Sequence, residues 1–254
     1  GGARHLAGLV PAAAYVPIKD FARSVKPAGT AREVFEHEVV PVFGLKLGPW
    51  LSEEAQKVAS SILNAGNGGG LTPQMVYSVV LYTLDTRLGG GTLEDNFYSA
   101  LNMSLQQRDM KVLSKIEGYL YYLMSALEKP APEPERVFFR GVPKSAYEVV
   151  RKNYTSGRRV HWSGISSISE DEQVSTTFAQ AEGAVEGNGP GGVVFRITAR
   201  TGRKIQHLSA LPAEAEVLLL PNFRGFVTRG LYRNGKVWSI DILEEADDSG
   251  TFVF

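Results

Sequence analysis

The stretch "PAPEPERVFFRGV", residues 130–142, divides the chain into two parts of different sequence character. Three prolines in its first half interrupt any helix that reaches it, so this half predicts a hinge. The second half, from Arg136 to Val142, is rich in β-branched and aromatic residues and is bounded by proline, which is typical of a strand. We therefore expect helices before this stretch and strands after it.

Upstream of the hinge, from about residue 52 to residue 129, apolar residues recur every three or four positions, the period of amphipathic helices. Helix-start signals divide this region into four helices, which begin at Ser52, at Thr72 with Pro73, at Thr92 and near Val112. We expect the apolar stripes of these helices to form a core.

Downstream, short runs of β-branched, aromatic and aliphatic residues alternate with Gly and Pro, as in strands. The segment at residues 225–243, "GFVTRGLYRNGKVWSIDIL", predicts a β-hairpin that turns at Asn234-Gly235. One short helix capped by Ser145 is expected among the strands. The sequence therefore predicts an α+β fold, in which an extension of unknown role (1–50) precedes a helical lobe (51–135) that packs on a β-rich core (136–254).

Composition restricts the class of protein. Lys plus Arg and Asp plus Glu both number 27, so no net charge attracts nucleic acid or an anionic membrane, and neither is an expected partner. No apolar run approaches the roughly 18 to 20 residues that span a bilayer. The chain has no cysteine, which excludes disulfides, thiol nucleophiles and zinc–thiolate sites. These features fit a cytoplasmic and a secreted protein equally, and they indicate no oligomeric state.

The first candidate site residue is Arg140, in the expected strand before Gly141. One interpretation is an edge charge or an ion-pair partner. The other is a fork-shaped donor for a phosphate or carboxylate, beside a glycine that allows close backbone approach.

The second candidate is a hydroxyl-rich segment at residues 161–178, "HWSGISSISEDEQVSTTF". Ser169 precedes three acids and is interpreted as the N-cap of a short helix running to Phe178. Ser166 and Ser167 are placed to fix a neighbouring side chain by hydrogen bonds. No G-x-S-x-G elbow surrounds them, which argues against a nucleophilic serine.

A Gly-rich segment, residues 181–192, follows. It lacks the Lys-Ser/Thr ending of a phosphate-binding loop. A mobile loop over a ligand and a plain surface loop are equal alternatives for it.

Two glutamates, Glu214 and Glu216, occupy alternate positions in "LPAEAEVLLLP", residues 211–221. Residues two apart in a strand point to the same face, about 6.5 to 7 Å apart. The pair is either a solvated strand end or two carboxylates in one cleft. In a cleft the pair suits a cationic substrate, or positive charge that develops in a transition state.

The order of these features resembles the arginine–serine–glutamate class of mono-ADP-ribosyltransferases. Ser167 follows Arg140 by 27 residues, and Glu216 follows Ser167 by 49. The segment "IQHLSALPAEAEVLLLP" is similar to the family's usual sequence around its acid pair. "EDNFYSALNMSLQQRD" and "YLYYLMSALEKPAPEPERVFFRGV" resemble helices of the eukaryotic, ecto-enzyme-like branch. The resemblance covers roughly residues 70 to 230.

This resemblance implies a split β-sandwich core, with residues 51–254 forming one catalytic domain. It implies transfer of ADP-ribose from NAD to arginine side chains of an acceptor protein with release of nicotinamide, so that NAD is consumed as a substrate and no metal takes part. It also implies NAD-binding residues Arg140, Gly141, Ser167, Ser169 and Phe178, and catalytic residues Glu214 and Glu216.

The family assigns roles to five of these positions. Arg140 would hold the phosphates and the nicotinamide-side ribose, Ser167 the floor of the nicotinamide pocket, and Phe178 its aromatic wall. Glu216 would bond the ribose 2′-hydroxyl, and Glu214 would select arginine as the acceptor.

Two substitutions depart from the family pattern. Phe139 replaces a frequent Tyr, and Ile168 replaces the middle hydroxyl of a Ser-Thr-Ser motif. The Gly-rich segment also has no clear second arginine, for which Arg158, Arg159 or Arg196 could compensate.

Rival functions are an NAD glycohydrolase, a non-catalytic NAD-binding or interaction module and, ranked last, a carbohydrate hydrolase. Glu214 argues against the first, and intact Arg140, Ser167 and Glu216 argue against the second. Adjacent carboxylates on one strand are hard to place on opposite sides of a sugar, which argues against the third. The expected transferase activity is compatible with three roles: a toxin, a surface enzyme or an intracellular regulator.

Overall fold

A computed structural model of the 254-residue chain describes residues 9, 21, 24–92, 95–210 and 216–245. Contacts divide the chain into two compact units. Of the described residues, the helical unit contains 21, 24–92, 95–131 and 203–210, and the strand unit contains 9, 132–202 and 216–245. The boundary at residues 131 and 132 falls in the Pro-rich stretch where the sequence predicts a hinge.

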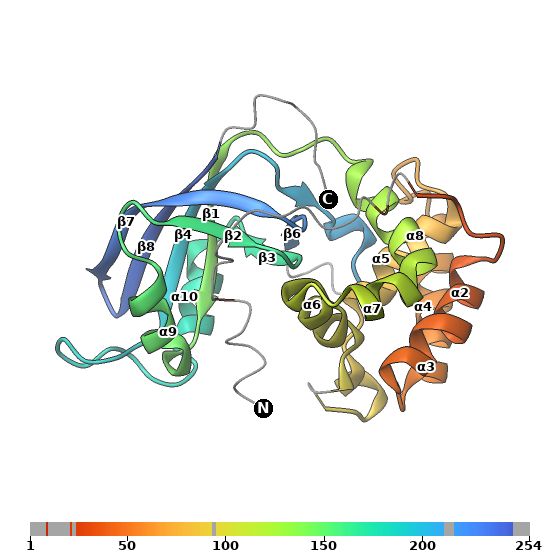
Figure 1. Cartoon of the computed structure of the whole chain (residues 1–254), viewed down its shortest axis with the longest axis horizontal. Coiled ribbons are helices and arrows are strands. Elements are labelled where there is room, and N and C mark those ends of the chain that lie inside the picture. Colours follow the sequence, from red (N-terminus) through yellow and green to blue (C-terminus); the bar gives the residue numbers. More distant parts are fainter. Residues whose placement is uncertain (1–8, 10–20, 22–23, 93–94, 211–215, 246–254) are drawn as a thin grey trace. The chain divides into compact units, whose positions relative to one another are not determined.

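Helices make up most of the described part of the helical unit (Figure 1). Its α-helices are α2 (Ala31–Val34), α3 (Val40–Phe43), α4 (Gly48–Asn64), α5 (Pro73–Thr83), α6 (Phe97–Gln107), α7 (Met110–Leu113) and α8 (Glu117–Glu128). A π-helical turn, Phe35–Val39, joins α2 to α3, and 3₁₀ turns lie at Thr86–Gly89, Ser114–Ile116 and Gln206–Leu208. Residues 31–50, which the sequence set apart as an extension, thus contribute helices to this unit.

Two of the four predicted helix starts illustrate when a local signal decides a helix boundary. Thr72 caps α5 as expected, because its hydroxyl accepts a hydrogen bond from the Met75 amide at 3.4 Å. The expectation for Ser52 is wrong, because α4 begins at Gly48 with Pro49 in its first turn. Ser52 is instead buried within α4.

The other two starts are displaced. The third helix begins at Phe97 rather than at Thr92, whose hydroxyl donates to Asp95 at 2.9 Å. The fourth is broken into α7, a 3₁₀ turn and α8. The apolar stripe nevertheless points inward, since Leu113, Ile116 and Leu127 are fully buried.

An aromatic cluster lies in the core of the helical unit. The ring of Phe97 makes edge-on contacts with Phe35 at 5.5 Å and with Tyr119 at 5.1 Å between centroids. All three side chains are fully buried. Such edge-to-face pairs stabilise a core beyond the apolar area they bury.

The strand unit contains seven of the eight strands of the sheet. Their order is β2-β7-β8-β4-β1-β3-β6. The strands are β1 (Arg136–Val142), β2 (Arg159–Trp162), β3 (Ser166–Ser169), β4 (Val193–Ala199), β6 (Glu216–Leu219), β7 (Phe223–Asn234) and β8 (Val237–Glu244). The two-residue strand β5 (Arg203–Lys204) belongs to the helical unit. The chain therefore has the predicted α+β fold, with helices first and a mixed sheet after them.

Among the strands β1–β4 and β6–β8 that the structure describes in this unit, one pairing is parallel and the others are antiparallel. Strand β4 runs parallel to β8 and antiparallel to β1. β1 and β3 are paired at a single residue couple, Phe139 and Ser169. This narrow junction joins a five-stranded part of the sheet to β3 and β6.

The sequence predicts a hairpin around Asn234-Gly235, and β7 and β8 do form a hairpin there, but its two-residue turn is Gly235-Lys236, one residue later than the predicted pair. Asn234 pairs with Val237, and Gly235 has a φ of +61°, which the turn requires. A short helix α9 (Tyr147–Asn153) and a helix α10 (Glu172–Ala179) complete this unit. The predicted cap of α9, Ser145, lies instead in a preceding 3₁₀ turn and donates its hydroxyl to Glu182 at 3.2 Å.

One face of the sheet carries the large apolar core of the strand unit, which includes Phe138, Trp162, Phe195 and Val217. Helix α10 packs on β1 and β4. A smaller apolar cluster there contains Ala179, Val194 and Val237. Both faces near β1 are thus partly covered, which is why a mainly apolar strand forms at this position.

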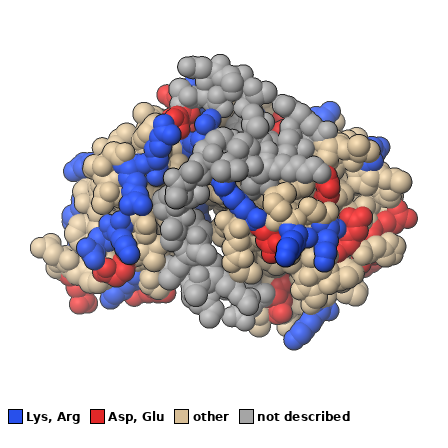
Figure 2. All heavy atoms as spheres, in the orientation of Figure 1, with Lys and Arg blue, Asp and Glu red and all other residues tan. Residues whose placement is uncertain are grey.

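Lys and Arg side chains gather over the strand unit in the view of Figure 2, with acidic side chains among them. Among the helices that the structure describes, none has the length and hydropathy to cross a membrane.

Candidate functional site

Strand β1 presents Arg140 on the same side as the buried Phe138, since residues two apart share a face. The Arg140 side chain is half-buried. Its Nη1 donates to the Ser166 hydroxyl at 3.1 Å, and its guanidinium lies over the Trp162 ring, 5.1 Å from the centroid. A hydroxyl and an indole ring, both uncharged, thus align this cation.

Trp162 is itself held on two sides. Its indole Nε1 donates to the Tyr154 hydroxyl at 2.8 Å, and its ring stacks on Phe223 with centroids 5.2 Å apart. Burial raises the pKa of Tyr154 above its ordinary value, and the nearby Arg140 charge opposes part of that rise. Tyr154 is therefore neutral at physiological pH. The sequence analysis did not assign Trp162 or Tyr154 to the site, because their link to Arg140 is long-range.

Gly141 lies beneath α10. A Cβ added at this position would lie 2.1 Å from the Ser175 carbonyl oxygen and 3.2 Å from the Ala179 amide nitrogen. The predicted close backbone approach is thus made by α10, directly beside Arg140. A role of Gly141 in binding NAD stays a prediction.

The second cluster joins β3 to β6. The Ser167 hydroxyl donates to Oε1 of Glu216 at 2.5 Å. These strands are antiparallel neighbours, and Ser167 and Glu216 lie on the same face, because Ser169 pairs directly with Glu216. The hydrogen bond orients the carboxylate of Glu216, which is partly exposed.

Ser169 sits at the junction of three strands, since its register partners are Phe139 on β1 and Glu216 on β6. It is buried, and its hydroxyl accepts a hydrogen bond from the Asp171 amide at 3.0 Å. The expectation that Ser169 is the N-cap of α10 is wrong, because Asp171 caps the helix through the Gln173 amide. Ser169 instead fixes the chain just before the helix.

The junction brings Arg140, Ser167 and Glu216 onto three neighbouring strands. Because strands in a sheet are about 4.8 Å apart, β1 and β6 are separated by about 10 Å. The strand register places Arg140 on the face of Ser166, and Ser167 and Glu216 on the opposite face. The structure therefore places three predicted site residues that are far apart in sequence on adjacent strands, with one hydrogen bond, between Ser167 and Glu216, linking two of them.

Two predicted residues are placed differently. Phe178 is 59% exposed on α10, and its contact with a ligand stays a prediction. Glu214 lies outside the described residues.

Two of the three cations considered as replacements for a second arginine, Arg196 and Arg159, have local partners. Arg196 pairs with Glu172 at 2.6 Å and with Asp241 at 3.6 Å. Arg159 pairs with Glu245 at 3.2 Å and lies over Phe226. These contacts give both residues a structural role in the sheet.

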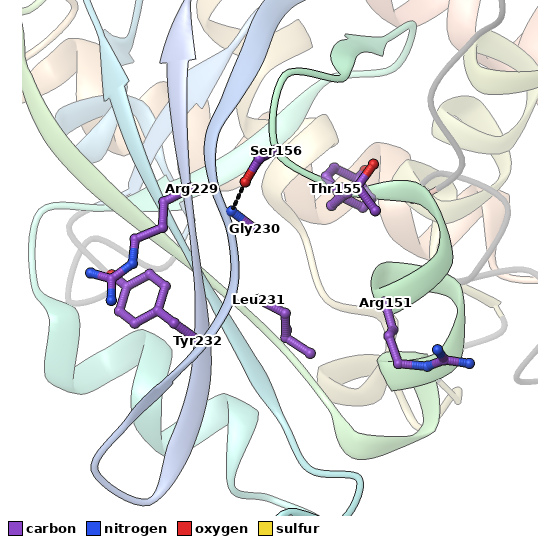
Figure 3. A pocket seen from close by; sticks show the side chains of 8 residues that line it. Arg151, Thr155, Ser156, Arg229, Gly230, Leu231 and Tyr232 are labelled. Carbon is purple, nitrogen blue, oxygen red and sulfur yellow. Dashed lines mark hydrogen bonds between the residues drawn. The ribbon is translucent and has the colours of Figure 1, made fainter.

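A separate shallow pocket lies between the end of α9 and β7 (Figure 3). Its lining includes Thr155, Ser156, Leu231 and Arg229. The Ser156 hydroxyl accepts a hydrogen bond from the Gly230 amide at 2.8 Å, and Arg229 lies over the ring of Tyr232. These contacts stabilise β7 near Gly230, whereas the predicted site residues that the structure describes lie on β1, β3, β6 and α10.

Bacterial proteins of known structure share this fold. The type III effector XopAI from Xanthomonas axonopodis pv. citri matches over 87% of this chain and 90% of its own, with a TM-score of 0.57 and 17% identity. The ADP-ribosyltransferase HopU1 of Pseudomonas syringae pv. tomato matches over 87% of this chain and 99% of its own, with a TM-score of 0.56 and 15% identity. The chain has an ADP-ribosyltransferase fold.

Exoenzyme S from Pseudomonas aeruginosa, solved bound to carba-NAD, shares this ADP-ribosyltransferase fold with a TM-score of 0.54 and 18% identity, over 87% of this chain and 94% of its own. No protein-family model matches the chain, and no curated protein is significantly similar to it in sequence. Among the described residues, no group of three or more His, Asp or Glu side chains could hold a metal ion.

Proposed function

We propose that this protein transfers ADP-ribose from NAD to arginine side chains, with release of nicotinamide. The observation that carries the proposal is the set of Arg140, Ser167 and Glu216 on three adjacent strands of an ADP-ribosyltransferase fold, with Ser167 bonded to Glu216. Exoenzyme S, of the same fold, binds carba-NAD.

Arg140 suits the diphosphate of NAD. A guanidinium presents donors in a rigid fork that matches phosphate oxygens. Because Ser166 and Trp162 already align the group, less conformational entropy is lost when the phosphates bind.

Glu216 suits the reacting ribose. Breaking the bond between nicotinamide and ribose builds positive charge on the sugar, as in glycoside hydrolysis. A carboxylate fixed beside that sugar stabilises the transition state more than the ground state. The Ser167 hydroxyl holds the Glu216 carboxylate in place for this role.

Glu214 would serve the acceptor. A guanidinium is charged in water and therefore a poor nucleophile. A carboxylate can hold it bidentately and take its proton as the nitrogen attacks the ribose. This division of work explains why two acids lie at alternate positions.

The wider sequence resemblance refines the proposal. The helices before β1 favour the eukaryotic, ecto-enzyme-like branch, whereas the solved structures compared above are bacterial. Ser169, Gly141 and Phe178 complete the proposed NAD site. The acceptor is an arginine of a protein partner.

The test is nicotinamide release from NAD, with and without agmatine as a small arginine mimic, followed by mass analysis of the products. We expect ADP-ribosyl-agmatine. Free ADP-ribose alone, formed at the same rate in both reactions, would favour the NAD glycohydrolase instead. Absence of turnover with retained NAD binding would favour a non-catalytic module.

Two variants test the roles of the acids. Glu216→Gln should abolish both transfer and hydrolysis, because both need stabilisation of the sugar cation. Glu214→Gln should lose transfer to agmatine and keep hydrolysis of NAD. Glu148→Gln, which changes an acid on α9 that pairs with Arg151, is the matched control. Identical behaviour of the first two variants would contradict the proposed division of work.

A further inference from the structure

The Gly-rich loop at residues 181–192 is fastened to the β7–β8 hairpin by Arg233. The Arg233 guanidinium donates from Nη1 to the Gly187 carbonyl at 2.8 Å and from Nη2 to the Val185 carbonyl at 3.1 Å. Its Nε donates to the Gly235 carbonyl at 2.7 Å. One planar fork thus joins the loop to the turn of the hairpin, a geometry that lysine cannot reproduce.

Trp238 fastens the second half of the loop. Its indole Nε1 donates to the Gly189 carbonyl at 3.1 Å, and its amide donates to the Gly192 carbonyl at 3.0 Å. The Val185 amide donates to the Lys236 carbonyl at 3.1 Å, and the Val185 side chain is buried. The loop therefore lies along the hairpin and is hydrogen-bonded to it at both halves, which favours the alternative of a surface loop.

The same hairpin also holds the start of α10. Glu172, the first residue of that helix, accepts hydrogen bonds from Arg196 at 2.6 Å and from the Asn234 side chain at 3.4 Å. Asn234 follows Arg233 directly. The hairpin thus contacts both ends of the segment formed by α10 and the Gly-rich loop.

Two glycines connect this segment to the candidate site. A Cβ on Gly192, at the end of the loop, would lie 1.8 Å from the Ala179 carbonyl oxygen at the end of α10. Gly141, beside Arg140, has a similar contact with Ser175 of α10. A shift of the loop would therefore move α10, and α10 would move against the residue next to Arg140.

We propose that Arg233 and Trp238 are positioning residues for NAD binding. They hold the Gly-rich loop and α10 so that Arg140 and Phe178 are in place for the dinucleotide. This inference rests on the proposed function. Both residues act through the loop and through α10, and neither takes part in the chemical step assigned to Glu216.

Arg233→Ala is the variant that tests the inference, and Arg229→Ala is its matched control on the same strand, where the guanidinium lies over Tyr232. A Glu-specific protease reports on the loop, which contains Glu182 and Glu186. Loss of three hydrogen bonds should speed cleavage by about tenfold or more. The control should be cleaved at the rate of the parent chain.

Nicotinamide release then separates binding from chemistry. We expect the KM for NAD of Arg233→Ala to rise about tenfold with kcat within about twofold of the parent, because a displaced binding group weakens NAD binding while Glu216 and Ser167 stay in place. Arg233→Lys should resemble Arg233→Ala, since it keeps the charge and loses the fork. Trp238→Phe keeps the ring and loses one donor, so it should show a smaller rise in KM.

Three results would overturn the inference: unchanged loop cleavage in Arg233→Ala, faster cleavage with an unchanged KM, or a fall in kcat alone. Trp238→Phe decides the matter if Arg233→Ala does not fold. If the parent chain releases no nicotinamide, the proposed function fails. Loop cleavage and calorimetric binding of NAD to the parent and the variants then still decide the positioning role.

Discussion

At the scale of single residues, two adjacent serines serve different partners. Ser166 accepts from Arg140, whereas Ser167 donates to Glu216, because neighbouring residues of a strand point to opposite faces. We expect Ser166→Ala to raise the KM for NAD about tenfold with little change in kcat. We expect Ser167→Ala to lower kcat about tenfold, since the carboxylate of Glu216 loses its alignment.

Steady-state nicotinamide release measures both effects. Ser61→Ala, on the exposed side of α4, is the control for loss of a hydroxyl. The double variant should combine a higher KM with a lower kcat, because the serines have different partners. Equal changes of kcat in the two single variants would show that the serines act as one group.

At the scale of elements, helix α10 packs directly against the backbone of Gly141 on β1. Gly141→Ala would place a methyl group 2.1 Å from a backbone oxygen of α10, which cannot move aside as a side chain would. We expect a loss of about 1–3 kcal/mol in the free energy of unfolding, as for overpacked cores. The KM for NAD should also rise, because Arg140 is the preceding residue.

Denaturant unfolding with matched kinetics checks this prediction. Gly29→Ala is the control, since its Cβ would make contacts of 3.4 Å and longer. An unchanged unfolding midpoint for Gly141→Ala would mean that α10 does not rest on β1 in solution.

Comparison of elements also shows how much the sequence could predict. Local signals were sufficient where the partners lie close in sequence, as at Thr72 and, to within one residue, at the turn of the β7–β8 hairpin. The predicted cap at Ser52 failed because a tertiary contact prevails: its hydroxyl donates to Glu36, 16 residues earlier, at 2.5 Å.

The candidate site follows the same rule. The order of Arg140, Ser167 and Glu216 was readable, because the family pattern is a spacing along the chain. Two contacts depend on how distant parts of the chain pack together: Trp162 of β2 with Arg140 of β1, which are not adjacent strands, and Arg233 with Gly187 of the Gly-rich loop, 46 residues away. Local periodicity carries no such information.

At the scale of the whole molecule, each unit buries tyrosine hydroxyls within its own core. In the helical unit, burial raises the pKa of Tyr77 to about 12 and that of Tyr119 well above its usual range. In the strand unit, burial raises the pKa of Tyr154. Each hydroxyl is hydrogen-bonded: Tyr77 to Ser52, Tyr119 to the Ser78 carbonyl, and Tyr154 to Trp162.

These pKa values predict a loss of stability in alkali. The neutral tyrosine is favoured in the folded state, so the unfolded chain releases its protons first, at an ordinary pKa of about 10. The stabilisation from Tyr77 is fully present below about pH 10 and is lost as pH rises toward about 12. Between these two pH values, each such tyrosine makes the free energy of unfolding fall by about 1.4 kcal/mol more per pH unit.

Denaturant unfolding at several pH values between about 9 and 12, with tyrosinate absorbance as a second signal, measures this slope. Tyr77→Phe should flatten the slope by the contribution of one proton, while its lost bond to Ser52 lowers stability at neutral pH. Because Tyr77 and Tyr154 belong to different units, Tyr154→Phe should flatten only the slope for the strand unit, which tryptophan fluorescence reports in a Trp50→Phe background, since Trp162 and Trp238 both lie in that unit. Ionisation of all tyrosines at ordinary pKa values, before any loss of structure, would contradict the burial of these hydroxyls.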